Sequence, residues 1–287
     1  MESAPALITF GDASSATRIA ARRGAGATGL VVQHQEFTFK RLFIDVPVVI
    51  FVESGTKALR WSGGEYIIRA GEAVAVANGH PLDITNRVAY RGEYRARWLA
   101  CDDALVAAHA SAHPQCPVIR SALPLSHASA DLGDAFKRAA QALADDALPD
   151  GIVRHRVTEL LLWVGLGGGR FEQVQDLTMS LRVRRLLVQD LARSWSAVEV
   201  ASAFAISEPT LRRRLADEDT SLTGILVDAR MSLALQLIQS TAQPVTQIAL
   251  AVGYQTSSQF AVRFRERFGF SPTAIRGHRR TGSPAPI

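Results

Sequence analysis

The chain contains 287 residues, of which 47% are apolar and 21% are charged, and its formal net charge is +5. This composition excludes a wholly disordered chain, a collagen and a coiled-coil rod, and the length suggests two domains. No apolar run reaches the roughly 18 residues that a membrane span requires, and the first residues lack the basic segment of a signal peptide. The two cysteines, Cys101 and Cys116, suffice for neither a disulfide framework nor a zinc cluster. We therefore expect a cytoplasmic protein without a membrane segment, a metal or a cofactor.

The positive charge is concentrated in the last third of the chain. Residues 176 to 280 contain 14 basic and 9 acidic side chains, and this excess equals the net charge of the whole chain. A neutral part joined to a basic part suggests a sensing module attached to a module that binds a polyanion. An uneven distribution of surface charge, which is common in proteins, would explain the same basic excess. A prediction of nucleic-acid binding therefore needs a second sequence feature.

The first hundred residues are predicted to form a β-sandwich or barrel. They contain short stretches rich in β-branched and aromatic residues, separated by Gly and Asn breaks. The stretches are Leu30–Phe39, Leu42–Val52, Glu65–Arg69, Glu72–Ala77 and Glu93–Leu99.

From Asp131 the apolar period becomes helical. It predicts helices over Leu132–Leu143 and Ile152–Leu166, which suit either a dimer interface or a cover for the sandwich. The glycine run at 165–169 then predicts a helix end and the start of a linker.

A first helix-turn-helix unit follows from local signals. Ser196 and Glu199 form a predicted capping box, and a short turn at Ala205–Ile206 precedes a second helix capped by Ser207. Leu211 and Leu215 of that helix are four residues apart and are expected to face inward together.

A second unit follows about fifty residues later. Its first helix ends at Gly253, which we expect in the left-handed conformation, and Thr256 to Gln259 begins the next helix. In that helix Phe260, Phe264 and Phe268 are spaced by four residues, as a core face is. Between the units, Ile225 to Ile238 continues helical spacing, so one long helix is predicted to hold two recognition helices about 34 Å apart, the repeat of the B-DNA major groove.

The segment Leu181–Arg276 resembles the DNA-binding domain of AraC/XylS-type transcription regulators. The matching residues occur in order in both units and in the connecting helix: Ala201, Ile206, Ser207, Leu211, Arg213, Leu215, Arg230, Ala234, Leu237, Pro244, Ile248, Ala249, Gly253, Tyr254, Ser258, Phe260, Phe264, Phe268, Gly269, Ser271, Pro272 and Arg276. The chain departs from the family pattern at Asp219, where many members have Gly, and at Val262, where many have Arg or Lys. Arg263 or Arg265 is expected to replace the phosphate contact absent at Val262.

The resemblance implies an α+β chain with the following organisation. Residues 1–168 form a sensor and dimerisation domain, a cupin-like β-sandwich or barrel with trailing helices. Residues 169–178 form a linker, 179–280 an all-α double helix-turn-helix domain, and 281–287 a disordered tail.

The resemblance also assigns DNA contacts by position. Arg212 and Arg213 are the strongest, because Arg can make two hydrogen bonds to guanine. The remaining short side chains at the second unit suggest that it anchors phosphates and senses DNA shape. The DNA-binding residues are expected to be Ser207, Pro209, Thr210, Arg212, Arg213, Thr256, Ser257, Ser258, Ala261, Arg263 and Arg265.

The first half has no comparably specific motif. His80 and His34 are isolated, so no metal is expected, and His80 suits a turn or the core. Arg91, Arg95 and Arg97 share one strand face and could bind an anionic effector, although a solvated outer face of the sandwich is the favoured interpretation. Their spacing, with Asp12 and Ser14, weakly resembles the cyclic-di-GMP site of PilZ proteins in the wrong chain order; fatty acids and other small molecules remain open.

The leading interpretation is a non-enzymatic, effector-gated activator that binds promoter DNA and RNA polymerase and forms a possible homodimer. One alternative is a ligand-independent repressor or architectural protein. Another is an alkyl-transfer repair enzyme that uses the same DNA-binding unit, against which the two isolated cysteines argue.

Overall fold

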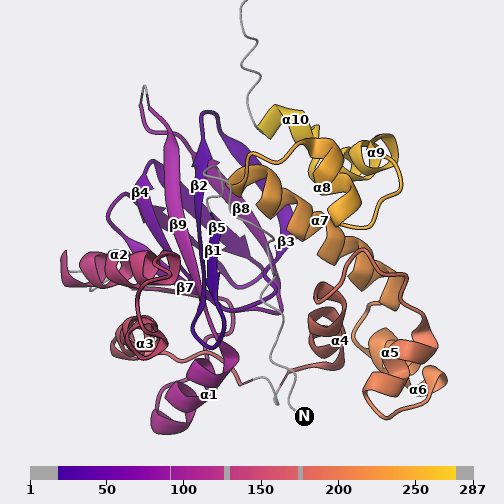
Figure 1. Ribbon diagram of the computed structural model, residues 1–287, viewed down its shortest axis with the longest axis horizontal. Helices are drawn as coiled ribbons and strands as arrows, with labels where there is room; N and C mark the ends of the chain where they lie inside the picture. Colours follow the sequence, from indigo (N-terminus) through magenta and orange to yellow (C-terminus); the bar gives the residue numbers. More distant parts are fainter. Residues whose placement is uncertain (1–18, 91, 126–129, 174–176, 276–287) are drawn as a thin grey trace, which may run out of the picture.

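The computed structural model describes residues 19–90, 92–125, 130–173 and 177–275, which form a β-sandwich domain followed by helices (Figure 1). The strands, in chain order, are β1 Ile19–Arg22, β2 Gly26–Gln33, β3 Phe37–Phe43, β4 Val48–Ser54, β5 Thr56–Trp61, β6 Gly64–Arg69, β7 Ala73–Val76, β8 Pro81–Arg87, β9 Tyr94–Cys101 and β10 Ala122–Pro124. They form a six-stranded sheet in the order β1-β2-β9-β4-β7-β10 and a four-stranded sheet in the order β3-β8-β5-β6. All paired neighbours are antiparallel.

Alternation along the strands divides the first domain into two cores. On β4, Val48, Ile50 and Val52 face the four-stranded sheet, whereas Val49 and Phe51 face the opposite side. Close approach of strands depends on small residues here: a side chain on Gly29 of β2 would collide with the indole of Trp98 on β9.

Three helices cover the outer face of the six-stranded sheet (Figure 1). Phe51 of β4 stacks on Phe136 of the second helix, with ring centroids 5.7 Å apart. The helices are α1 Asp103–Ala112, α2 Ala130–Ala144 and α3 Asp150–Leu166. The two predicted helices in this region are therefore confirmed as α2 and α3, and α1 was not predicted.

The remainder of the described chain is helical. Its helices are α4 Met179–Val188, α5 Ala197–Ala203, α6 Glu208–Asp217, α7 Leu222–Ser240, α8 Val245–Ala251, α9 Ser257–Phe268 and α10 Pro272–Ile275. The expected architecture, a β-sandwich with trailing helices followed by an all-α double helix-turn-helix domain, is confirmed. Part of the predicted linker packs on the first domain. Arg170 forms an isolated β-bridge with Val118, and the side chain of Phe171 is 2% exposed. Residues 174–176 and the predicted tail 281–287 lie outside the described residues.

Two of the predicted strands are wrong in extent. Leu30–Phe39 is interrupted by the polar segment His34–Glu36, which separates β2 from β3. Leu42–Val52 is interrupted before Val48, because Pro47 has no amide hydrogen to donate to a neighbouring strand. The other three stretches correspond to β6, β7 and β9, while β1, β5, β8 and β10 were not predicted.

No single helix in the described part of the chain is long and apolar enough to cross a membrane. Within the described residues, one pair of helices, α6 and α7 with a bend of 66° between them, meets that criterion by length and composition when taken together.

Candidate DNA interface

The first helix-turn-helix unit consists of α5 and α6. Ser196 accepts a hydrogen bond from the amide of Glu199, whose carboxylate accepts one in return, so the predicted capping box is present. These bonds and the Arg193 guanidinium lower the pKa of the Glu199 carboxyl to about 2. The turn before α6 contains Ala205 at φ 54°, a left-handed conformation that costs a non-glycine residue free energy.

Ser207 begins α6 as predicted. Its hydroxyl accepts from the Thr210 amide at 3.3 Å and lies 2.8 Å from the Thr210 hydroxyl. Pro209 occupies the first turn, where its missing amide hydrogen is not needed. Leu211 and Leu215 are both buried, which turns Arg212, Arg213 and Arg214 toward solvent.

The second unit consists of α8 and α9. Gly253 follows α8 with φ 84°, and Gly269 ends α9 with the same φ, as expected for left-handed helix ends. Thr256 accepts from the Gln259 amide at 3.2 Å and so caps the start of α9. The predicted core face of α9 is confirmed, since Phe260 and Phe264 are 0% exposed and Phe268 is 7% exposed.

A single helix, α7, connects the two units as predicted (Figure 1). Its 19 residues correspond to about 28 Å of helix. Ile225, Ala229, Leu233 and Leu237 are buried along it. The first unit lies at the beginning of α7 and the second at its end. Because the buried contacts fix α7 in the core, the two units have little freedom to change their separation.

The arginines of the two recognition helices differ in their ion pairs. Arg212 pairs with Glu208 one turn earlier at 2.5 Å, and Arg263 pairs with Glu266 at 3.0 Å. Arg213 and Arg265 are exposed and have no acidic partner among the described residues. These two guanidiniums are therefore the more available for a phosphate or a base.

The remaining predicted DNA contacts lie at the beginning of α9. Ser257 and Ser258 are exposed in its first turn, and Ala261 is half-buried one turn later. Val262 is 58% exposed, so the position that lacks the family's usual cation faces solvent. The neighbouring Arg263 is exposed but ion-paired with Glu266. The structure thus places the predicted serines, threonines and proline at the starts of α6 and α9, whereas Arg265 lies in the last turn of α9. The roles of all these residues on DNA stay predictions.

The predicted anionic effector site receives no support from the sandwich. Arg95 and Arg97 do share one face of β9, but Arg95 pairs with Glu93 and Arg97 pairs with Glu53. Their charges are therefore partly compensated. Asp12, Ser14 and Arg91 lie outside the described residues, as does Arg276. Binding of cyclic-di-GMP stays an untested prediction.

The isolated histidines and cysteines occupy ordinary structural positions. His80 is exposed in the turn between β7 and β8, and His34 lies 3.8 Å from the carboxylate of Glu93. No group of three metal-ligating side chains occurs among the described residues. Burial and the neighbouring Asp102 raise the pKa of the Cys101 thiol to about 12, which disfavours the reactive thiolate.

Sequence reasoning missed a set of arginines that join the second recognition helix to the sandwich. Arg267, in the last turn of α9, donates to the carbonyl of Lys40 at 2.7 Å and to that of Arg41, and pairs with Asp228 at 3.0 Å. The far end of α9, where Ser257 and Ser258 lie, remains exposed. The sandwich therefore holds α9 at its C-terminal end and leaves open the end where Ser257 and Ser258 lie.

Two arginines of α4 complete this link. Arg184, whose side chain is 4% exposed, pairs with Asp45, lies 4.3 Å from the Phe43 ring centroid and donates to Ser232. Arg185 forms a bidentate pair with Asp103 at 2.7 and 2.8 Å. The only sequence signal for these roles was the presence of three arginines among the apolar residues of this short helix.

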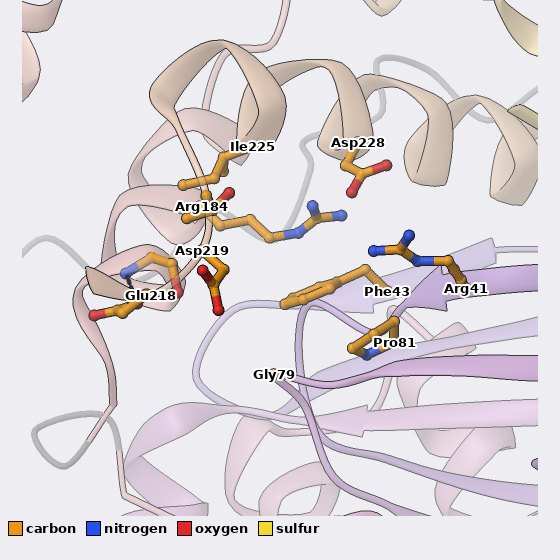
Figure 2. Close-up of a pocket in the computed structure, with 11 residues that line it drawn as sticks. Arg41, Phe43, Gly79, Pro81, Arg184, Glu218, Asp219, Ile225 and Asp228 are labelled. Atoms are coloured by element: carbon orange, nitrogen blue, oxygen red, sulfur yellow. Dashed lines mark hydrogen bonds between the residues drawn. The ribbon is translucent and has the colours of Figure 1, made fainter. Parts of the chain in front are cut away.

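An interdomain cavity of about 230 Å³ lies beside these contacts (Figure 2). Phe43 and Pro81 line its sandwich side, Glu218 and Asp219 line its helical side, and Arg41 extends toward it. The carboxylate of Glu218 also accepts hydrogen bonds from the amides of Met179 and Ser180 and so caps the start of α4. The cavity thus borders both the turn after α6 and the strand that holds Arg267.

Aromatic rings form a second interdomain contact, which we call the phenylalanine seam. It joins Phe37 and Phe39 of β3 to Phe268 and Phe270 of the helical domain. The ring centroids of Phe37 and Phe270 are 5.0 Å apart, and those of Phe39 and Phe270 are 5.6 Å apart. The two halves therefore share one continuous core.

Comparison with known proteins agrees with this geometry in the second half. A family model described as a helix-turn-helix domain matches residues 200–278. The transcriptional regulator SirC of Salmonella typhimurium is 36% identical over 110 residues, which are 38% of this chain and 37% of SirC. The second half of the chain is therefore similar in sequence to part of this regulator. The transcriptional activator CsvR of Escherichia coli is also 36% identical, over 91 residues that cover 32% of this chain and 34% of CsvR. The matched segments span about a third of the length of these relatives.

Solved structures extend the likeness to the whole fold. ToxT of Vibrio cholerae matches with a TM-score of 0.63 and 13% identity, covering 87% of this chain and 97% of ToxT. A structure of wild-type ToxT with bound unsaturated fatty acid matches with a TM-score of 0.64 and 12% identity, covering 87% of this chain and 94% of that one. At this identity the likeness shows a shared fold, in which a β-domain precedes the helical domain.

Proposed function

We propose that the protein is a transcription regulator that binds promoter DNA through α6 and α9 and has no enzymatic role. The observation that carries this proposal is the pair of complete helix-turn-helix units attached to the two ends of one buried helix. Two such units at the ends of a helix about 28 Å long suit neighbouring major grooves on one face of the duplex. The basic excess of the last third adds attraction for phosphates.

The residues divide into three groups in this proposal. Arg213 contacts a base and Arg265 contacts the phosphate backbone, because both guanidiniums are exposed and without an acidic partner among the described residues. Ser207, Thr210 and Thr256 hold the starts of the recognition helices through their capping hydrogen bonds. Pro209, Ser257, Ser258 and Ala261 contribute shape at the DNA surface.

The first domain acts as a sensor in the same proposal. The ion pairs and the phenylalanine seam connect the sandwich directly to α4 and α9, so a ligand that shifts the sandwich also shifts a recognition helix. ToxT, which shares the fold, has been solved with an unsaturated fatty acid bound. We further propose a cytoplasmic location, contact with RNA polymerase as an activator, and a homodimer formed through the sandwich domain.

Selection of binding sites from random duplex DNA tests the proposal. The full-length protein should enrich one sequence family, and footprints should show two protected patches centred about 10 base pairs apart on one face. Affinity should fall steeply with added salt. Recovery of no preferred sequence, or a single short protected patch, would contradict the proposal that α6 and α9 both bind the DNA.

A further inference from the structure

The recognition helices α6 and α9 share the same spacing of cap and core residues. Each begins after a capping hydroxyl, that of Ser207 for α6 and that of Thr256 for α9, which accepts from the amide three residues later. In both helices the residues four and eight positions after the cap are buried. These core residues are Leu211 and Leu215 in α6 and Phe260 and Phe264 in α9. Positions at equal distances from the two caps are therefore equivalent.

The sixth position after the cap is exposed on both helices. It is occupied by Arg213 in α6 and by Val262 in α9, and Val262 is 58% exposed. Because successive residues of a helix turn by about 100°, this position lies on the side opposite the core residues. Val262 is accordingly absent from both apolar cores of the described residues. A branched apolar side chain thus takes the outward place that an arginine takes in the first unit.

The outward face of α9 is polar on both sides of Val262. Ser258 precedes it by four residues and Arg265 follows it by three, so the three residues share one face, and all of them are exposed. The sandwich holds α9 through Arg267, which lies about 140° round the helix axis from Val262. The face that carries Val262 is therefore turned away from the contact with the first domain.

The chemistry of valine limits what this position can recognise. Valine is a weaker helix former than arginine or alanine, because its branched side chain loses rotamer freedom in a helix. Its methyl groups form no hydrogen bond to a phosphate or to a base edge. The apolar group that a base pair presents in the major groove is the C5 methyl of thymine, and small apolar side chains recognise it by contact. Thymine is therefore the base that suits Val262.

We propose that Val262 determines part of the sequence specificity by packing on the C5 methyl of a thymine in the DNA site. The inference rests on the proposed function, in which α9 enters a major groove. At equivalent positions, Arg213 then reads a guanine by hydrogen bonds and Val262 reads a thymine by apolar contact. The preferred DNA should contain these two bases about 10 base pairs apart, one for each recognition helix.

Replacement of single thymines by deoxyuridine tests the proposal. Uracil pairs with adenine as thymine does and lacks only the C5 methyl. In gel-shift titrations of the full-length protein with the selected DNA, one replacement should weaken binding about three- to fivefold, the effect of leaving one methyl group unburied. That thymine should lie about 10 base pairs from the position whose preference relaxes in Arg213→Ala. A site in which every thymine tolerates replacement overturns the proposal.

Variants of Val262 assign the methyl effect to this side chain. Val262→Ala should bind the thymine duplex about as weakly as the unchanged protein binds the uracil duplex, and it should lose little more on replacement of that thymine. Val262→Arg should also be insensitive to the methyl group, and its binding should depend more steeply on salt because it adds a cation at the DNA surface. A full uracil effect in Val262→Ala would assign the methyl contact to another residue and overturn the proposal.

Leu250→Ala is the matched control. It removes an apolar side chain that is 61% exposed on the neighbouring helix α8, and it should keep the full uracil effect. Because Val262 and Leu250 are both exposed, all of these variants should unfold at nearly the same Tm as the unchanged protein. An unchanged protein that selects no DNA sequence refutes the proposed function, whereas selection of a sequence without any dependence on a thymine methyl refutes only the role of Val262.

Discussion

The buried amine of Lys57 makes stability depend on pH. Its pKa falls from 10.5 in the unfolded chain to about 7 in the folded protein, so between these values the unfolded chain holds more protons. The free energy of unfolding should therefore rise with pH, by about 1.5 kcal/mol between pH 7 and 8.5. Above pH 9 the raised pKa of the Cys101 thiol acts in the opposite direction.

Urea unfolding at pH 7 and 8.5 measures this effect. Lys57→Met should abolish the rise, whereas Lys137→Met on the surface of α2 should retain it. Equal pH dependence in both variants would show that another group is responsible.

Arg213 is the residue on which specific DNA binding should depend most. It is exposed on α6 between the ion-paired Arg212 and the core residue Leu215, with no acidic partner among the described residues. Arg213→Ala should weaken binding to the selected DNA by about 1–3 kcal/mol and relax the preference at one base position. Arg265→Ala should instead weaken binding to all sequences and reduce the salt dependence.

Gel-shift titrations over several salt concentrations separate these effects. Arg154→Ala, on the exposed side of α3, is the control and should leave both quantities unchanged. Uniform weakening by Arg213→Ala would assign that residue to the backbone.

At the scale of elements, the turn between α5 and α6 contains removable strain. Ala205 is exposed and has φ 54°, which glycine adopts without the clash of a Cβ atom. Ala205→Gly should raise the free energy of unfolding by about 0.5–1 kcal/mol. Ala108→Gly in the exposed middle of α1 should lower it by about 1 kcal/mol, and denaturant titration compares the two. A loss of stability at Ala205 would indicate that flexibility outweighs strain in this turn.

The helix-turn-helix units could be predicted closely because their signals are local. Caps such as Ser196 and Ser207 and the left-handed Gly253 and Gly269 act within a few residues, so the sequence alone reveals them. The strands β5 and β8 escaped prediction for the opposite reason. Their inward positions include Lys57 and Asn86, which break the apolar alternation that marks a strand.

The contacts between the domains could not be predicted, because they join residues far apart in the sequence. Arg184 and Asp45 are separated by 139 positions, and Arg267 bonds carbonyl oxygens of Lys40 and Arg41 more than 220 positions away. The sequence around a loop carboxylate or a backbone carbonyl does not indicate which distant arginine will contact it. These contacts follow only once the whole chain is folded.

At the scale of the whole molecule, the buried guanidinium of Arg184 makes Asp45 a sensitive position. Asp45→Ala would leave an almost fully buried cation without its carboxylate. The free energy of unfolding should fall by about 3 kcal/mol. Asp134→Ala, which removes an exposed pair with Lys137, should cost less than about 1 kcal/mol. Chemical denaturation provides both values, and equal losses would mean that the Arg184 pair is no more important than a surface pair.

The phenylalanine seam has a practical consequence for dissecting this molecule. Excising either half would transfer the rings of Phe37, Phe39, Phe268 and Phe270 from a shared core to water. Such a fragment exposes a new hydrophobic patch and tends to aggregate during purification. Work on separate halves therefore needs polar replacements at these four positions, or a solubilising fusion partner.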